Sequence, residues 1–149
     1  MATPVDNLLR LQALAEQTGD ADLAAWLSEG LDAYLFGELP LEQALNLHAD
    51  GPGKRTARCH YLQHQRNAAI RDAWSLCDGD SPWRQSVALA SEVKRFRGIL
   101  WPRWRSLDAP PATTSNLRRH LFQAHRCGDV PTSPEQLHRI ALLMQGGPA

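Results

Sequence analysis

Apolar residues recur every three or four positions along most of this chain, which is the spacing of amphipathic helices, and no stretch alternates with the period of two that a strand requires. Alanine, leucine, arginine, glutamine and glutamate, which favour helices, dominate the sequence. The strongest stripe lies in residues 21–36 and consists of Leu23, Trp26, Leu27, Leu31, Tyr34 and Leu35. The pattern predicts an all-α fold, a compact bundle of six or seven helices that forms a single helical domain over residues 1–149.

Residues 1–48 are expected to form acidic N-terminal helices. One helix is predicted over 5–17, one over 21–36 that stops at Gly37, and a short one over 40–47 after Pro40. The core positions expected outside the 21–36 stripe are Leu8, Leu11, Ala15, Leu41, Ala44 and Leu45. Turn-forming residues in 48–53 and 108–112 predict linkers, so we expect weak subdivisions near residues 50 and 110.

Residues 55–106 are expected to form basic central helices. The first runs to about residue 77, and its apolar stripe is Cys59, Leu62, Ala69, Ile70, Ala73 and Cys77. Arg66 falls in the middle of that stripe, so it must either extend to solvent or pair with an acid of the N-terminal third. The next helix begins with Ser81 as N-cap and Pro82 as first residue, and Pro102 is expected to kink or end it.

Residues 114–145 are expected to form a C-terminal helical hairpin. A helix near 115–126 is followed by Gly128, and a second helix begins at Ser133, where the Ser-Pro-Glu-Gln sequence is typical of a capping box. The second helix is expected to expose Glu135, Gln136, His138 and Arg139. A helix, a glycine turn and a helix are compatible with a helix-turn-helix, but an ordinary αα-hairpin that closes the bundle is the favoured interpretation.

The formal net charge is zero, yet the charges are unevenly placed. Residues 1–50 hold nine acids and one base, and the rest of the chain holds seven acids and fifteen bases. Fourteen of the sixteen bases are arginines, whose planar fork of donors suits phosphates and carboxylates. A GC-rich genome would also raise the ratio of arginine to lysine, but it would not explain where the charges lie. The asymmetry therefore indicates an interaction surface.

Basic residues gather in three stretches that we expect to be helical, and the third, in the C-terminal pair, contains Arg118, Arg119, His120, His125 and Arg126. Residues 54–71 hold five bases, two histidines and no acid, and residues 84–105 hold six bases and one acid. With the 40–47 helix before it, the first stretch has the outline of a helix-turn-helix with an unusually long connection. In the second, Trp101 and Trp104 alternate with arginines and either stack on bases or anchor the helix in the core. The candidate nucleic-acid-binding residues are Lys54, Arg55, Arg58, His64, Asn67, Arg71, Arg95, Arg103 and Arg105.

Metal binding and catalysis receive little support. His60 and His64 are one turn apart, a spacing that can chelate zinc, but no neighbouring acid completes a set of ligands. No nucleophile elbow, zincin motif, phosphate-binding loop or dinucleotide fingerprint is present. We therefore expect no enzyme, no cofactor and no metal.

Cysteine spacing and hydropathy indicate the compartment. The three cysteines form no C-x-x-C pair and are expected to be mostly buried thiols in a reducing environment. No secretory signal and no stretch of about 20 apolar residues is present, so we expect a cytoplasmic protein without membrane contact.

Two functions remain. The first is a nucleic-acid-binding, most simply DNA-binding, regulatory protein of bacterial type, with the basic helices on phosphates. The alternative is a non-enzymatic adaptor or inhibitor that binds a protein through its Trp/Arg surface or its acidic N-terminal helices. Those acids either neutralise the chain's own bases or imitate nucleic acid for a basic partner.

Overall fold

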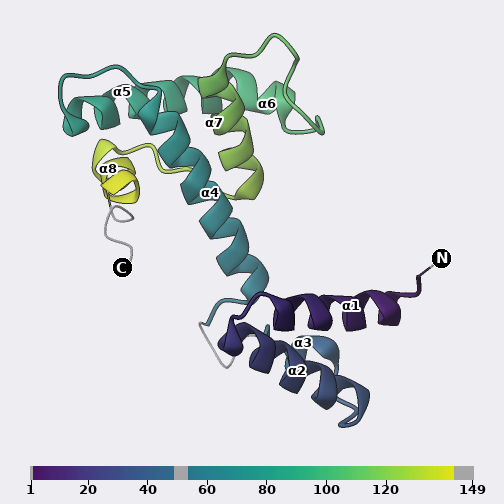
Figure 1. The fold of residues 1–149 in the computed structure, drawn as a ribbon. Helices are drawn as coiled ribbons and strands as arrows, with labels where there is room; N and C mark the ends of the chain where they lie inside the picture. Colours follow the sequence, from purple (N-terminus) through teal and green to yellow (C-terminus); the bar gives the residue numbers. More distant parts are fainter. Residues whose placement is uncertain (1, 49–53, 143–149) are drawn as a thin grey trace. The chain divides into compact units, whose positions relative to one another are not determined.

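The computed structural model describes residues 2–48 and 54–142, and the regular structure of these residues is entirely helical (Figure 1). Because α5, the π-helical turn η1 and α6 follow one another without a break, the described residues form seven continuous helical segments. The prediction of an all-α fold with six or seven helices is confirmed. The chain divides into two compact units between Arg58 and Cys59, close to the subdivision expected near residue 50.

The N-terminal unit begins with two capped helices, α1 (Pro4–Gln17) and α2 (Ala21–Leu35). Thr3 and Asp6 form a capping box, in which Asp6 Oδ2 accepts a hydrogen bond from Thr3 N–H at 2.8 Å. This backbone bond, together with the Thr3 hydroxyl, lowers the pKa of Asp6. Asp20 caps α2 by accepting from the Leu23 N–H at 3.0 Å. Both helices therefore lie where the periodicity predicted them.

The short helix α3 (Leu41–Ala44) packs against α2, and Pro40 is its N-cap. It ends earlier than the predicted 40–47 because Asn46 adopts a φ of 53°, which a helix does not allow. The core of this unit is small and consists of Ala15, Leu27, Leu31 and Leu45, with Leu8 and Leu41 half-buried.

Several predicted core positions of the N-terminal unit are wrong. Leu11, Leu23, Trp26, Tyr34 and Leu35 are all exposed. α1 and α2 cover only the middle of each other's apolar stripe, so the edges of both stripes remain in solvent.

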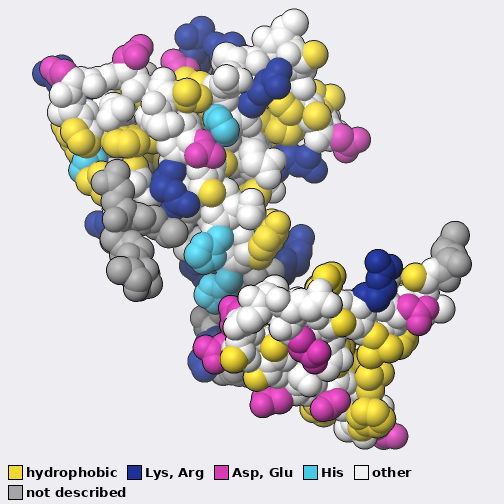
Figure 2. All heavy atoms as spheres, in the orientation of Figure 1, with side chains coloured by type: hydrophobic (Ala, Val, Ile, Leu, Met, Phe, Trp, Pro, Cys, Tyr) yellow, Lys and Arg dark blue, Asp and Glu magenta, His cyan; other side chains and the backbone are white. Residues whose placement is uncertain are grey.

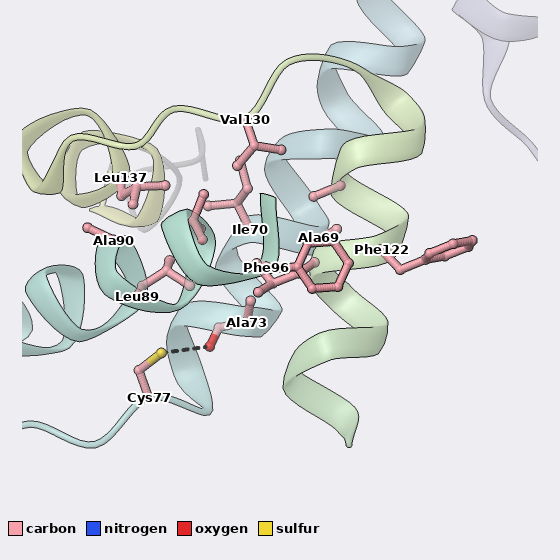
Figure 3. Close-up of a cluster of buried hydrophobic side chains, with 13 residues drawn as sticks. Ala69, Ile70, Ala73, Cys77, Leu89, Ala90, Phe96, Phe122, Val130 and Leu137 are labelled. Atoms are coloured by element: carbon pink, nitrogen blue, oxygen red, sulfur yellow. Dashed lines mark hydrogen bonds between the residues drawn. The ribbon is translucent and has the colours of Figure 1, made fainter. Parts of the chain in front are cut away.

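The C-terminal unit has a larger core, which its helices enclose as the periodicity predicted (Figure 3). α4 (Ala57–Ser75) contributes Ala69, Ile70 and Ala73, and the turn after it contributes Cys77, whose thiol lies 3.4 Å from the Ala73 carbonyl oxygen. The other buried members are Leu89, Ala90, Val93, Phe96, Leu121, Phe122, Ala124, Val130 and Leu137.

α5 (Pro82–Arg95) starts at the predicted proline, and its N-cap Ser81 accepts from the Arg84 N–H at 3.2 Å. The helix does not end at Pro102, one of the two outcomes predicted for it. A π-helical turn, η1 (Phe96–Leu100), leads into α6 (Trp101–Trp104). A proline inside an α-helix removes a hydrogen bond and crowds the carbonyl one turn earlier, and a π-turn is a known place where a helix absorbs such a defect.

α7 (Asn116–Cys127) and α8 (Pro134–Leu142) form the expected C-terminal pair, and the Ser133 hydroxyl accepts from the Gln136 N–H at 3.2 Å. No helix-turn-helix unit is shown in the described residues. α3 is a single turn, too short for the first helix of that motif, and the segment between α7 and α8 covers 128–133, longer than its usual turn.

Candidate nucleic-acid interface

The predicted binding residues are divided between the two units. Lys54, Arg55 and Arg58 belong to the N-terminal unit, and the other six belong to the C-terminal unit. The boundary also changes the charge asymmetry, because residues 1–58 hold nine acids and four bases, whereas residues 59–149 hold seven acids and twelve bases. The basic excess is therefore a property of the C-terminal unit.

The α4 candidates differ in accessibility. His64 is exposed, but Asn67 and Arg71 are half-buried. The Asn67 amide oxygen accepts from Arg66 Nε at 3.1 Å and from Arg66 Nη2 at 2.9 Å. An asparagine that reads adenine uses this same oxygen for the adenine amino group. Such a contact at Asn67 would first require the bonds with Arg66 to break.

Arg66 itself neither extends freely to solvent nor pairs with an acid of the N-terminal third, so neither predicted outcome is correct. Its Nη1 donates to the backbone carbonyl of Asp129 at 2.9 Å, and the rest of its guanidinium is held by Asn67. Arg66 thereby fixes the segment between α7 and α8 to α4. A half-buried arginine on an apolar stripe is satisfied here by a neutral oxygen rather than by a carboxylate.

Two further arginines hold loops in the same way. Arg119 donates to the carbonyls of Ala112 and Thr114 at 2.7 and 3.0 Å, and Arg126 donates to the carbonyl of Asp108 at 2.5 Å. Both bind the segment that leads from α6 to α7. The basic run at the C-terminal hairpin therefore contains residues with a structural role, and only part of it is available to a ligand.

The α5–η1–α6 rod carries a different kind of basic residue. Lys94, Arg95, Arg103 and Arg105 are exposed and make no hydrogen bond or ion pair within residues 2–48 and 54–142. The single acid in residues 82–107 is Glu92, which is half-buried. We call these four residues the free basic set.

The position of the free basic set follows from helical geometry. Phe96, Trp101 and Trp104 pack inward. Arg95 and Arg103 directly precede Phe96 and Trp104, so each lies about 100° around the helix axis from an inward-facing ring, on the same flank of the rod. These two residues lie about 12 Å apart along the axis at the ordinary helical rise. The face drawn in Figure 2 shows the bases of the C-terminal unit as separate patches with acids between them.

Other bases on the rod have acidic partners. Arg84 Nε lies 3.6 Å from Asp80, and Arg97 Nη2 lies 3.3 Å from Asp129. Both pairs are largely exposed, so each contributes little to stability, at most about 1 kcal/mol. A polyanion competing for Arg84 or Arg97 would displace a weak partner, whereas none has to be displaced at the free basic set.

Both tryptophans that alternate with these arginines face the core. Trp101 and Trp104 are half-buried, and they pack with Phe96 and Phe122 at ring-centroid distances of 5.7 to 6.5 Å. Of the two interpretations of these residues, the structural one agrees with this packing. Base stacking would need exposed ring faces, which this cluster uses internally.

His125 belongs to the same aromatic cluster and is not a surface cation. Its ring lies 5.1 Å from that of Phe96 and 5.3 Å from that of Trp101. Nδ1 lies 2.7 Å from the Leu121 carbonyl oxygen, which can only accept, so Nδ1 carries the proton. Nε2 is buried and has no partner among the described residues. Burial, reinforced by Arg97, lowers the pKa of His125 and favours the neutral ring.

A polar network between α4, α5 and α8 was not anticipated. Ser86 is fully buried, accepts from Trp74 Nε1 at 3.0 Å, and lies 3.0 Å from His138 Nδ1 and from the Pro82 carbonyl oxygen. His138, expected to be exposed, is half-buried and meets Trp83 edge to face at 5.5 Å. A usable signal was present, because Ser86 falls at a core position of the α5 stripe, and a buried hydroxyl needs a partner.

Next to this network lies a shallow pocket of about 510 Å³, lined by Trp83, Glu135, His138, Arg139 and Leu142. Its lining combines one acid, one base and two apolar side chains with the imidazole. This mixture selects no particular ligand charge.

The cysteines and histidines form no metal centre in the described part of the chain, where no group of three or more potential ligands is close enough to hold an ion. Cys59 is exposed rather than buried, because the core covers the α4 stripe only from Ala69 onward. Cys77 is buried, and burial, with Glu92 and Asp78 nearby, raises the pKa of its thiol to about 11.

None of the helices formed by residues 2–48 and 54–142 has both the length and the apolar character needed to cross a bilayer. Comparison of the chain with protein-family models, with curated proteins and with solved structures finds no match.

Proposed function

We propose that the C-terminal unit binds nucleic acid through the free basic set on the α5–η1–α6 rod. The observation that carries this proposal is the contrast between two classes of arginine. Arg66, Arg119 and Arg126 donate hydrogen bonds to the protein's own carbonyls, whereas Arg95 and Arg103 are exposed and have no acceptor within residues 2–48 and 54–142. Guanidinium forks without partners match phosphate oxygens in geometry and charge.

The expected recognition is of the phosphate backbone rather than of bases. The α4 asparagine is held by Arg66, and the two tryptophans of α6 are packed inward, so these three side chains are not available for base contacts. A protein that contacts mainly phosphates binds with little sequence preference and with a strong salt dependence. A regulatory role would then require specificity from another source, such as a partner.

The test is a fluorescence anisotropy titration of labelled single- and double-stranded oligonucleotides at several salt concentrations. Replacing Arg95, Arg103 and Arg105 with Gln should weaken binding and reduce the slope of log affinity against log salt by about 2.7 if each arginine neutralises one phosphate of a duplex.

The matched control replaces three exposed glutamines, Gln17, Gln43 and Gln65, with Glu, which changes the net charge equally. It should leave most of the salt slope in place. Absence of binding at low salt, or an equal loss in the two triple variants, would refute the assignment to the rod.

A second candidate function is a protein-binding adaptor that uses the acidic N-terminal helices. The observation that favours it is the large number of exposed apolar side chains in that unit, above all Phe36, which is 81% exposed. The inward packing of Trp101 and Trp104 makes the Trp/Arg surface the weaker site for such a partner. Reversing charges between Asp20 and Glu42 should abolish this function, and reversing charges on the rod should abolish the first.

A further inference from the structure

Large apolar side chains are exposed along both helices of the N-terminal unit, and they are most concentrated at one end of the pair. Six large apolar side chains there are between 38% and 81% exposed. Four of them follow one another closely where α2 ends, and two lie on the first turns of α1. We call this group the apolar end: Val5, Leu9, Tyr34, Leu35, Phe36 and Leu39.

Backbone geometry brings these residues to one place. α1 and α2 run antiparallel (Figure 1), and Gln12 Nε2 donates to the Ser28 hydroxyl at 3.2 Å. Moving back along α1 therefore corresponds to moving forward along α2, which sets Val5 level with Leu35. The Leu39 N–H bonds to the Ala33 carbonyl at 3.3 Å and folds the following loop back onto the helix. Figure 2 shows apolar side chains gathered at this end of the unit.

The exposure is large for so small a unit. Among residues 2–48, four hydrophobic residues are buried in the core, whereas six large ones are exposed at this single end. Contiguous apolar surface of a few hundred Å² on a small protein usually marks an interaction site. Phe36 provides the kind of aromatic anchor that dominates the binding energy of an interface.

The surrounding charge identifies the occupant. Asp32 lies in the last turns of α2, Glu38 lies between Phe36 and Leu39, and residues 2–48 hold eight acids and one base. A second copy of the same end would bring like charges together, which opposes self-association. A helix with apolar residues on one face and lysines or arginines beside them would satisfy both the apolar surface and the carboxylates.

We propose that the apolar end is the docking site for a basic amphipathic helix of a protein partner. This inference rests on the second candidate function, protein binding by the acidic N-terminal helices, and specifies its partner by chemistry. It is independent of nucleic-acid binding by the rod.

The experiment uses the full chain and a labelled 18-residue helical peptide of leucine and lysine with all leucines on one face. A peptide of the same composition, scrambled so that leucines surround the helix, is the control. We expect the amphipathic peptide to bind at least about tenfold more tightly than the scrambled one. Replacing Phe36 and Leu39 with Ser, which leaves every charge in place, should remove that difference.

A second variant, Asp32→Asn with Glu38→Gln, should lower affinity at low salt and flatten its salt dependence while leaving the preference for the amphipathic peptide. Circular dichroism of both variants checks that α1 and α2 remain folded, which the exposure of all four substituted side chains favours. Equal binding of the two peptides, or no effect of the Phe36 and Leu39 substitutions, would overturn the proposal.

Sedimentation separates the remaining outcomes. A concentration-dependent dimer that the Phe36 and Leu39 substitutions dissociate would assign the apolar end to a second copy and overturn the proposed occupant. If charge reversal between Asp20 and Glu42 releases a protein partner while neither peptide binds, the adaptor function survives and only the partner class is wrong. If neither peptide binds and charge reversal between Asp20 and Glu42 releases no protein, both the proposed helix-docking site and the adaptor function are wrong.

Discussion

Gly30 offers the sharpest test of how the N-terminal unit is packed. It lies in the interior of α2 and is buried beneath α3. A Cβ atom built on Gly30 would lie 2.3 Å from Leu45 Cδ2 and 3.2 Å from the Ala44 carbonyl oxygen. The first contact can be relieved only if Leu45 moves, and the second is with backbone. Gly30→Ala therefore sets helix propensity against the fit of α3 on α2.

The two effects have different sizes. Alanine in place of glycine inside a helix would ordinarily stabilise by about 1 kcal/mol. Overpacking a well-fitted site costs about 1–3 kcal/mol. Leu45 is one of four buried hydrophobic residues among those described in this unit, so its displacement disturbs a large share of the core. The difference is a net loss of up to about 2 kcal/mol in the stability of the N-terminal unit, and the share of the core that is disturbed favours the upper end of that range.

Trp26 reports this change directly. It is the only tryptophan in residues 1–58, and its indole Nε1–H donates to the Leu45 carbonyl at 3.2 Å. A urea titration followed through the Trp26 indole resonance in ¹H–¹⁵N spectra should show an earlier midpoint in Gly30→Ala. Adding Leu45→Val, which shortens the obstructing side chain, should recover part of the loss.

Gly98 provides the matched control. It lies in the π-helical turn η1, and a Cβ atom there would meet nothing within 4 Å. Gly98→Ala should therefore stabilise the C-terminal unit by about 0.5–1 kcal/mol, because it only restricts the unfolded chain. A stabilised Gly30→Ala variant would refute the close approach of α3 to α2 on which the reasoning depends.

Two further predictions concern the C-terminal unit. Ser86→Ala should lower stability in urea by about 1–3 kcal/mol, because Trp74 and His138 lose their shared partner, whereas Ser91→Ala on the exposed side of the same helix should change it by less than about 0.5 kcal/mol. His125 has a pKa lowered by burial, so the unfolded state binds its proton first. The free energy of unfolding should therefore fall as the pH drops below about 6.5 and level off once the pH passes the folded pKa, and a His125→Phe variant that kept this pH dependence would contradict the assignment.

The sequence pattern predicted the helices well because local rules decide where they begin and end. Ser81 and Ser133 cap α5 and α8 as expected, and the core stripes of the C-terminal unit are buried at their central positions. The extent of burial in the N-terminal unit was not predictable in the same way. Periodicity locates an apolar stripe. How much of that stripe is buried depends on how much of it the neighbouring helices contact, which the pattern does not give.

The site was less predictable than the fold because a single residue type serves two purposes here. Nothing in the local sequence distinguishes Arg126, which donates to a loop carbonyl, from Arg103, which has no acceptor in the part of the chain that the structure describes. The difference arises from loops that fold back on helices, and the path of a loop depends on tertiary structure. Trp101 and Trp104 show the same limit, since their alternation with arginines is equally compatible with base stacking and with the core.

The charge asymmetry of the sequence can be explained when the charges of each unit are considered on their own. Surface ion pairs contribute too little to fold either unit, so the segregation of acids and bases between them is not needed for stability. It does set what each unit can attract. An acidic unit with uncovered apolar side chains repels phosphates and its own copies, whereas a basic rod repels basic helices. If both sites are used, the same chain can join a polyanion to a basic protein without the two ligands competing for one surface, and the charge-reversal variants should then affect each ligand independently.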